Sequence, residues 1–371
     1  MASRRCVLVV GASGLVGRAA VARFLADGDG PGAFDVVAVS RRELGFDDES
    51  HLRHLPLDLR DGRAVAAAIH ELPPVSHLVY AAAHERPGLV AGWSDPQQMA
   101  TNRSMLDNVL TPLAARGDLR HVTLMQGTKA YGVHLHPIRL PARERHPRDE
   151  HPNFYWLQED LLRERAASAG FGWTILRPVQ VVGPAYGVAY CTPPVIGAFA
   201  AICHEEGLPF GFPGGTIAPA KQAVDVRLVA DAIRWAVDSP AAIGEHFNLT
   251  NGEVFGWTEI WPVLAEVMGV EPADPKPLRL SDFLEDRAAT WSRVVARHHL
   301  RRLNLAQLLG QSHLYADYTF GVDVTVLPPP ALVSSVKIKQ AGFGAVYDTE
   351  VTFTYALESL IRQRILPDLR K

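Results

Sequence analysis

The sequence predicts an α/β protein, built on a doubly wound parallel sheet of about seven strands with a smaller, mostly helical C-terminal lobe. Three observations support this fold class. Short apolar segments alternate with amphipathic ones over the first 125 residues, a glycine-rich turn follows the first apolar segment, and helical patterns separated by Pro-rich stretches fill much of the chain beyond residue 186. Alternating strands and helices form βαβ units, which align parallel strands and cover both faces of one sheet.

Five short segments are predicted to be buried strands because they are apolar on both faces, as strands covered by helices must be. These segments are Val7–Val10, Asp35–Val39, His77–Ala81, His121–Met125 and Trp173–Arg177. Seven other segments carry apolar residues at helical spacing and are predicted to be helices. They are Leu15–Ala26, Gly62–Glu71, Gln97–Ala114, Leu228–Val237, Trp257–Met268, Leu280–Val295 and Leu303–Leu309.

The composition excludes several classes of protein. Of 371 residues, 47% are apolar and 21% are charged, which is ordinary for a globular domain. Basic and acidic residues number 37 and 40, so no basic field attracts nucleic acid or anionic lipid. The three cysteines cannot form a disulfide framework, the N-terminal apolar run Cys6–Val10 is too short for a signal-peptide core, and no stretch of 18 uncharged apolar residues could span a membrane. We expect a cytoplasmic protein, monomeric or homodimeric, with neither nucleic acid nor membrane as a partner.

A glycine-rich turn between the first strand and the first helix predicts a dinucleotide site. Glycine is needed where the backbone turns tightly or approaches a pyrophosphate, and the helix that follows offers free N–H groups to the phosphates. A strand before the turn and a helix after it favour this interpretation over a turn that binds nothing, and they predict a Rossmann sheet. The residues expected to contact the cofactor here are Gly11, Ser13, Gly14, Leu15, Val16 and Gly17.

The end of the second strand indicates which dinucleotide is bound. NAD-binding sites place an acid there for the ribose 2′-hydroxyl, but this chain has Ser40, Arg41 and Arg42. Arginine forks suit a phosphate monoester, so NADP(H) is favoured over NAD(H); the alternative is a solvated arginine pair without a ligand. The ends of the third and fourth strands are expected to add Asp58, Leu59, Ala81 and Ala82 to the cofactor site.

Two longer blocks carry a resemblance to a known family. The first is Gln126–Gly132, with the sequence QGTKAYG, and the second is Asn153–Asp160, with the sequence NFYWLQED. Together with the glycine-rich turn, they resemble the extended short-chain dehydrogenase/reductase superfamily and, within it, the progesterone 5β-reductase/iridoid synthase-like family. The similarity runs nearly from end to end of the chain.

The resemblance implies an NADPH-dependent reductase of α,β-unsaturated or simple carbonyl compounds. In this family hydride passes from the nicotinamide to the β-carbon, and a lysine and a tyrosine hydroxyl hold the oxygen on which charge develops. The family's lysine corresponds to Lys129. The resemblance further implies that Gln126, Lys129, Pro178 and Val179 lie beside the cofactor.

The chain departs from the family pattern at the tyrosine. In the family this block begins NFYY, and the family's tyrosine is the second tyrosine, a position where this chain has Trp156. An indole cannot give a proton as a phenol can. Tyr190, Tyr131 or Tyr155 could supply the missing hydroxyl. The departure leaves two other hypotheses open: a redox-neutral isomerase or carbon–carbon lyase/cyclase that keeps NADP(H), and a non-catalytic NADP(H) sensor. The expected catalytic residues are Lys129, Tyr190, Tyr155 and Trp156.

The chain is expected to form two parts. Residues 1–185 are expected to form the NADP(H)-binding Rossmann domain, to which residues 220–255 return, and residues 186–371 a substrate-binding lobe. The lobe should provide an apolar pocket for a small apolar carbonyl substrate. Its expected aromatic lining is Tyr190, Phe210, Phe212 and Trp257.

Asp225 and the histidines between residues 134 and 151 are not expected to take part in catalysis or metal binding. Asp225 precedes a predicted helix and is expected to be its N-terminal cap. The histidines between residues 134 and 151 have no cysteine or carboxylate at a convincing ligand spacing, so no metal site is expected.

Overall fold

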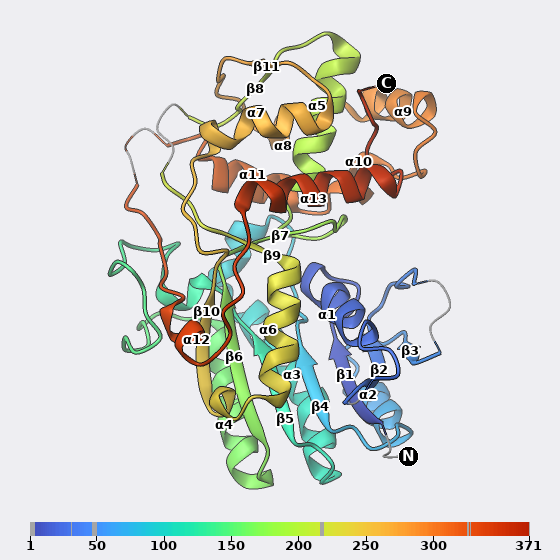
Figure 1. The fold of residues 1–371 in the computed structure, drawn as a ribbon, viewed down its shortest axis with the longest axis vertical. Coiled ribbons are helices and arrows are strands. Elements are labelled where there is room, and N and C mark those ends of the chain that lie inside the picture. The colour runs from blue at the N-terminus through green and yellow to red at the C-terminus, as the bar shows by residue number, and fades with distance from the viewer. Residues whose placement is uncertain are drawn as a thin grey trace.

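A parallel seven-stranded sheet with helices on both faces carries an upper lobe of helices (Figure 1). The structure is a computed structural model that describes residues 4–30, 32–46, 50–215, 219–324, 326 and 328–370. The strand order is β10-β6-β5-β4-β1-β2-β3, and every pairing in this sheet is parallel. The strands are β1 Arg5–Val10, β2 Phe34–Val39, β3 Leu52–Leu55, β4 His77–Tyr80, β5 His121–Met125, β6 Gly172–Pro178 and β10 Glu245–Leu249.

Alternating side chains of the buried strands pack into two separate cores. In β1, Val7 and Val9 face one core, whereas Leu8 and Val10 face the other, as the two-residue period of a strand requires. Helices α1 (Leu15–Leu25) and α6 (Val226–Asp238) cover the first face. The second face is covered by α2 Gly62–His70, α3 Pro96–Ala115 and α4 Phe154–Ala169.

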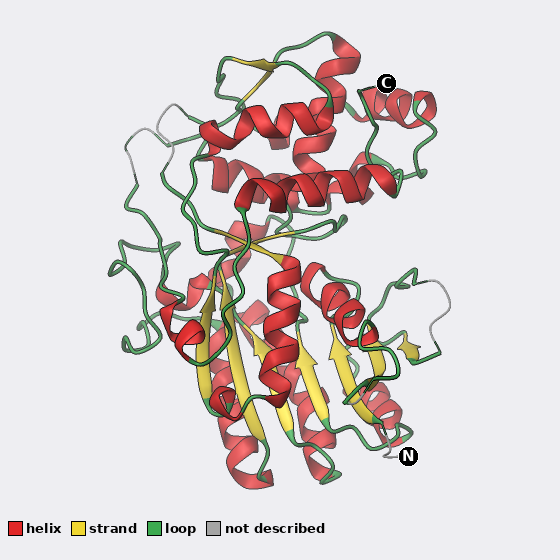
Figure 2. Cartoon of the chain, viewed as in Figure 1, coloured by secondary structure: helices red, strands yellow, loops and turns green. Residues whose placement is uncertain are grey.

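Helices make up most of the upper lobe (Figure 2). They pack around an aromatic core that includes Trp257, Trp291, Phe320 and Phe353. Its helices are α5 Pro193–Glu206, α7 Trp257–Met268, α8 Leu280–Glu285, α9 Ala288–Arg297, α10 Leu305–Leu309, α11 Ser312–Phe320 and α13 Thr349–Arg362. Short strands β8 Phe210–Gly211 and β11 Pro272–Ala273 pair within it. No helix in the described part of the chain is long and apolar enough to cross a membrane.

Shorter elements join the lobe to the sheet. Strands β7 (Gln180–Val182) and β9 (Ala223–Asp225) pair where the two parts meet, and α12 (Val336–Gln340) returns the C-terminal segment to β10. Three 3₁₀ helices complete the list of elements among the described residues: η1 Leu89–Ser94, η2 Thr128–Tyr131 and η3 Pro240–Ala242. Asp225 caps α6 as expected, since its carboxylate accepts a hydrogen bond from the Arg227 amide at 2.8 Å.

The doubly wound sheet is confirmed, and the differences from expectation have physical causes. The third strand ends at Leu55 rather than at Asp58–Leu59, and the helix expected over 280–295 is split into α8 and α9. Helix α5 was not predicted because residues 193–203 are buried on every side, which removes the amphipathic period. Helix α4 was also missed, because its buried face includes two polar residues, Gln158 and Glu159.

We predict that Gly17→Ala lowers stability by about 1–3 kcal/mol through overpacking. A Cβ at Gly17 would lie 2.2 Å from the Gly11 carbonyl oxygen, so α1 would have to move away from the turn. Gly344→Ala is the matched control, because a Cβ there meets no heavy atom within 4 Å. Thermal unfolding of the two variants measures the effect. Equal unfolding midpoints would show that α1 is not packed against the turn as described.

Candidate active site

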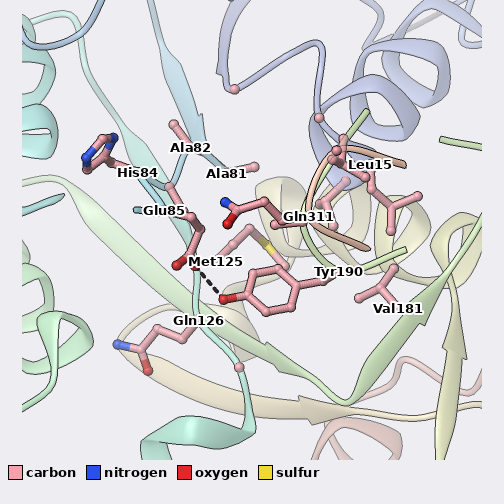
Figure 3. A pocket seen from close by; sticks show the side chains of 18 of the residues that line it. Leu15, Ala81, Ala82, His84, Glu85, Met125, Gln126, Val181, Tyr190 and Gln311 are labelled. Carbon is pink, nitrogen blue, oxygen red and sulfur yellow. Dashed lines mark hydrogen bonds between the residues drawn. The ribbon is translucent and has the colours of Figure 1, made fainter. Parts of the chain in front are cut away.

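A pocket of about 710 Å³ opens at the carboxyl ends of the parallel strands, between the sheet and the helical lobe. Its floor is the topological switch point of the sheet, where β1 and β4 lie side by side although they are not consecutive. Ligands of doubly wound sheets bind at this position. Figure 3 shows side chains from both parts of the molecule pointing toward this space, among them Glu85, Tyr190 and Gln311.

The glycine-rich turn forms a cradle at one end of the pocket. Gly11 has a φ of +86°, and a Cβ there would lie 2.7 Å from the Ala82 nitrogen. Gly14 is the N-cap of α1 and has no capping side chain, and a Cβ on it would meet only the Gly11 oxygen within 4 Å. The helix therefore presents uncapped N–H groups at the pocket wall, with no acidic side chain in its first turn. These features fit the pyrophosphate of a dinucleotide.

Two arginines line the pocket where β2 ends. The Ser40 hydroxyl donates to the Arg42 carbonyl oxygen at 2.6 Å, which tightens this turn. The Arg42 guanidinium donates to the carbonyl oxygens of Ser13 and Gly187 at 3.3 and 3.2 Å and so spans the pocket mouth. Asp58 also lines the pocket, but hydrogen bonds from Arg60 hold its carboxylate and lower its pKa to about 2. Arg41 and Arg42 therefore leave the wall cationic.

Lys129 lies on η2, immediately beyond β5, and its side chain is partly buried in the pocket wall. Its ammonium donates to the Tyr190 hydroxyl at 2.9 Å and lies 3.5 Å from the centroid of the Trp93 ring. Burial lowers the pKa of Lys129 to about 7, while the negative charge of Glu85 opposes the shift. The site thus holds an amine whose charge changes near neutral pH.

The Tyr190 hydroxyl is fully engaged by protein groups. It donates to Glu85 Oε1 at 2.6 Å, which is the dashed bond in Figure 3, and it accepts from Lys129 and from Trp93 Nε1, both at 2.9 Å. Because a hydroxyl has one proton and two lone pairs, these three bonds use its capacity. Burial and the Glu85 carboxylate raise the pKa of Tyr190. Gln98 Nε2 donates to the second Glu85 oxygen at 2.9 Å.

The aromatic block at the start of α4 presents Tyr155, not Trp156, to the pocket. Successive helical residues project about 100° apart, and in this helix Phe154 and Tyr155 line the pocket whereas Trp156 does not. In the described part of the chain no group hydrogen-bonds the Tyr155 hydroxyl, and burial raises its pKa. Trp156 is buried elsewhere, with the guanidinium of Arg148 at 4.6 Å and that of Arg177 at 5.7 Å from its ring. The expectation that position 156 faces the pocket is therefore corrected.

Most of the expected site residues line this one pocket. The exceptions are Trp156 and Gly17, which packs beneath the turn. The lining residues are Gly11, Ser13, Gly14, Leu15, Val16, Ser40, Arg41, Arg42, Asp58, Leu59, Ala81, Ala82, Gln126, Lys129, Tyr155, Pro178, Val179 and Tyr190. Tyr131 lies outside it and donates to Asn248 at 2.7 Å.

The expected aromatic lining is partly wrong. Phe210, Phe212 and Trp257 are buried in the lobe core rather than exposed to the pocket. The pocket instead has an aromatic wall, by which we mean Trp93, Tyr315 and Tyr318. Sequence reasoning also missed Glu85, although an acid that follows a parallel strand is a signal that could have found it.

The fold and the site define an NAD(P)-dependent oxidoreductase of the short-chain dehydrogenase/reductase type. Residues 7–250 match the model described as "NAD dependent epimerase/dehydratase family", and the chain belongs to this family. No group of three or more His, Cys, Asp or Glu side chains among the described residues is arranged to hold a metal ion.

Two curated relatives and one solved structure illustrate the relationship. An (S)-8-oxocitronellyl enol synthase of Nepeta cataria is 30% identical over 98% of this chain and 92% of its own. A 3-oxo-Delta(4,5)-steroid 5-beta-reductase of Arabidopsis thaliana is 29% identical over 97% and 92%. A Thermus thermophilus UDP-glucose 4-epimerase, solved with NAD, shares the fold at a TM-score of 0.65 and 20% identity, over 95% and 98% of the two chains.

We predict that Trp156→Tyr leaves dinucleotide affinity unchanged and costs about 1 kcal/mol of stability, because the indole packs under Arg148 outside the pocket. Tyr155→Trp is the matched comparison one residue away, and its larger ring should enter the pocket and weaken binding. Fluorescence titration with NADPH and thermal unfolding measure the two effects. A loss of affinity in Trp156→Tyr as large as that in Tyr155→Trp would contradict the placement of the two side chains.

Proposed function

We propose that the protein is an NADPH-dependent reductase of small, apolar α,β-unsaturated carbonyl compounds. The observation that carries this proposal is the pairing of two donors in one pocket: the Lys129 ammonium and the Tyr155 hydroxyl, which has no partner in the described part of the chain. Both belong to segments at the carboxyl ends of strands, where a dinucleotide's reactive end is expected.

The named activities of the relatives support this chemistry. One relative is a reductase of a 3-oxo-Delta(4,5)-steroid, and the other is named for the enol that it makes. An enol is the protonated form of the oxyanion that remains when hydride adds to the β-carbon of an enone. A site that serves such a reaction needs hydrogen-bond donors where negative charge develops on oxygen.

The residues of the pocket have distinct tasks in this scheme. Bound NADPH supplies the hydride. The Tyr155 hydroxyl would donate to the substrate oxygen and pass its proton there, and the phenolate that remains would take a proton from solvent after the product leaves. Lys129 would use an N–H that Tyr190 does not occupy, because an ammonium has three. The aromatic wall (Trp93, Tyr315 and Tyr318) receives the apolar body of the substrate and excludes water.

The proposal also covers the choice of cofactor and the roles of the two parts of the chain. Arg41 and Arg42 would hold the 2′-phosphate of NADP(H), for which a guanidinium fork is suited. Residues 1–185 together with 220–255 would bind the dinucleotide, and the rest of residues 186–371 would shape the substrate side. The isomerase, lyase/cyclase and sensor hypotheses were based on Trp156 standing in the pocket where the family has a tyrosine. Because Tyr155 lines the pocket and Trp156 does not, this observation no longer favours them over reduction.

We predict that the protein consumes NADPH with α,β-unsaturated aldehydes or ketones, and that Tyr155→Phe and Lys129→Ala each lower turnover by about 10²–10⁴-fold. NADPH affinity should change little, because both groups act on the substrate oxygen. Absorbance at 340 nm reports consumption, and mass spectrometry of the product locates the added hydrogens. The matched control is Tyr347→Phe, which removes a phenol outside the pocket.

The substrate panel distinguishes the competing activities. Saturated analogues of each enone are included, and reduction of these alone would show simple carbonyl reduction. Conversion of a substrate without net NADPH consumption would instead establish the redox-neutral alternative. Full turnover in Tyr155→Phe would contradict its assignment as the proton donor.

We predict that the unmodified protein binds NADPH more tightly than NADH, and that Arg41→Ala/Arg42→Ala abolishes the difference. Each charge-assisted hydrogen bond contributes about 1.5–3 kcal/mol, so the preference should fall by at least tenfold for each arginine that contacts the phosphate. The ratio of the two dissociation constants is the measurement. Arg103→Ala, an exposed arginine on α3 outside the pocket, is the control. Equal affinity of the unmodified protein for both dinucleotides would refute the preference.

A further inference from the structure

Tyr190 joins a carboxylate to the Lys129 ammonium. Its hydroxyl donates to Glu85 and accepts from Lys129 and Trp93, so it has no free proton for a substrate oxygen. Tyr190 therefore orients the groups that it bonds and does not itself bond the reacting atoms. The neighbour that the proposed mechanism uses is Lys129.

The helical lobe holds the segment that carries Tyr190. Val188 accepts hydrogen bonds at its carbonyl oxygen from the Gln311 amide at 3.2 Å and from the Ser312 hydroxyl at 2.8 Å. The Cys191 amide donates to the same Ser312 hydroxyl at 3.1 Å, and the Gly187 amide donates to the Leu308 carbonyl at 2.8 Å. The backbone is thus tied to α10 and α11 on both sides of Tyr190.

Hydrogen bonds from helix α3 hold the segment that carries Glu85 on the other side of the pocket. The His84 amide donates to Asn102 Oδ1 at 2.8 Å, and Asn102 Nδ2 donates back to the His84 carbonyl at 2.9 Å. The Arg86 amide donates to Gln98 Oε1 at 2.8 Å, while Gln98 Nε2 bonds the Glu85 carboxylate. Helix α3 therefore clamps the backbone before and after Glu85 and also one of its carboxylate oxygens.

The charges around Lys129 make Glu85 its counter-ion. Among the described residues, the titratable groups that interact with the ammonium are Glu85 from the loop after β4, Tyr190 from the lobe and His134 from the loop after η2; Tyr155 from α4 lines the same pocket. Burial and the charge of Lys129 lower the pKa of His134 to about 4, so it is neutral at physiological pH. Glu85 is the one carboxyl group in this set, and Tyr190 connects it to the lysine.

We propose that Glu85 and Tyr190 are positioning residues that fix the Lys129 ammonium over the Trp93 ring and keep it charged for turnover. This inference rests on the proposed function, in which Lys129 contacts the substrate oxygen. Lys129 has two requirements. Its flexible four-carbon stem must be held in one position, and its ammonium needs an opposite charge because an unpaired cation in an apolar pocket is costly. A carboxylate linked through a phenol satisfies both requirements without occupying the place of the substrate.

The direct test is the titration of Lys129 itself in the protein without substrate. The chain has six lysines, so NMR of protein labelled at the lysine side chains gives few signals, and Lys129→Arg identifies one of them. Lys221, whose pKa burial lowers to about 8, is an internal reference. Glu85→Gln should move the titration of Lys129 down by about one pH unit, because an opposite charge is lost, and should leave Lys221 in place. Glu150→Gln removes an exposed acid outside the pocket and is the control.

Activity provides the second readout. The ammonium is the competent form, so kcat/KM should fall as pH rises through about 7, and the falling limb should lie about one unit lower in Glu85→Gln. Tyr190→Phe should lower kcat about 10–100-fold with little change in KM, because the lysine loses its alignment. Glu85→Asp, which keeps the charge, should restore the pH profile in part.

The outcomes separate the inference from the proposed function. An unmoved Lys129 titration in Glu85→Gln overturns the positioning role, even if Lys129→Ala is inactive. A titration that moves while the kcat/KM profile stays in place overturns the assignment of Lys129 to the reaction. Equal changes at Lys129 and Lys221 would show general loosening of the fold and would also overturn the inference.

Discussion

The absence of side chains at Gly11 and Gly17 is the constraint on which the rest of the structure depends. Gly11 lets the turn after β1 lie against the backbone at the end of β4, and Gly17 lets α1 begin directly on that turn. The uncapped start of α1 consequently stands at the switch point of the sheet. Because parallel strands all end at one edge, residues distant in the sequence then meet around a single pocket.

That pocket must keep a cation in largely apolar surroundings. An ammonium loses hydration there, and the loss is offset by a ring face, a phenol and a carboxylate, supplied by Trp93, Tyr190 and Glu85. These groups come from the loop after β4 and from the segment that the helical lobe holds. The site is therefore complete only where lobe and sheet pack together.

A single helical position decides how the site is interpreted. If Trp156 faced the pocket in place of Tyr155, the pocket would offer an indole N–H there, which cannot give a proton as a phenol can. With Tyr155 in that place, a phenol that has no hydrogen-bond partner among the described residues is available, and the buried tryptophan packs between Arg148 and Arg177 outside the pocket. Aligning a block of residues to a family leaves this choice open, because adjacent side chains on a helix differ in direction by about 100°.

The sequence by itself determined the doubly wound sheet, the glycine-rich turn, the arginines after β2 and the lysine after β5. Each of these is encoded locally, by a two-residue or helical period or by residue types at the end of a strand. It could not reveal α5, because a helix buried on all sides has no amphipathic period, nor the direction of Tyr155. Only the tertiary structure brought residues 85, 129 and 190 together, because their contacts depend on how the strands are ordered and on where the lobe folds back over the sheet.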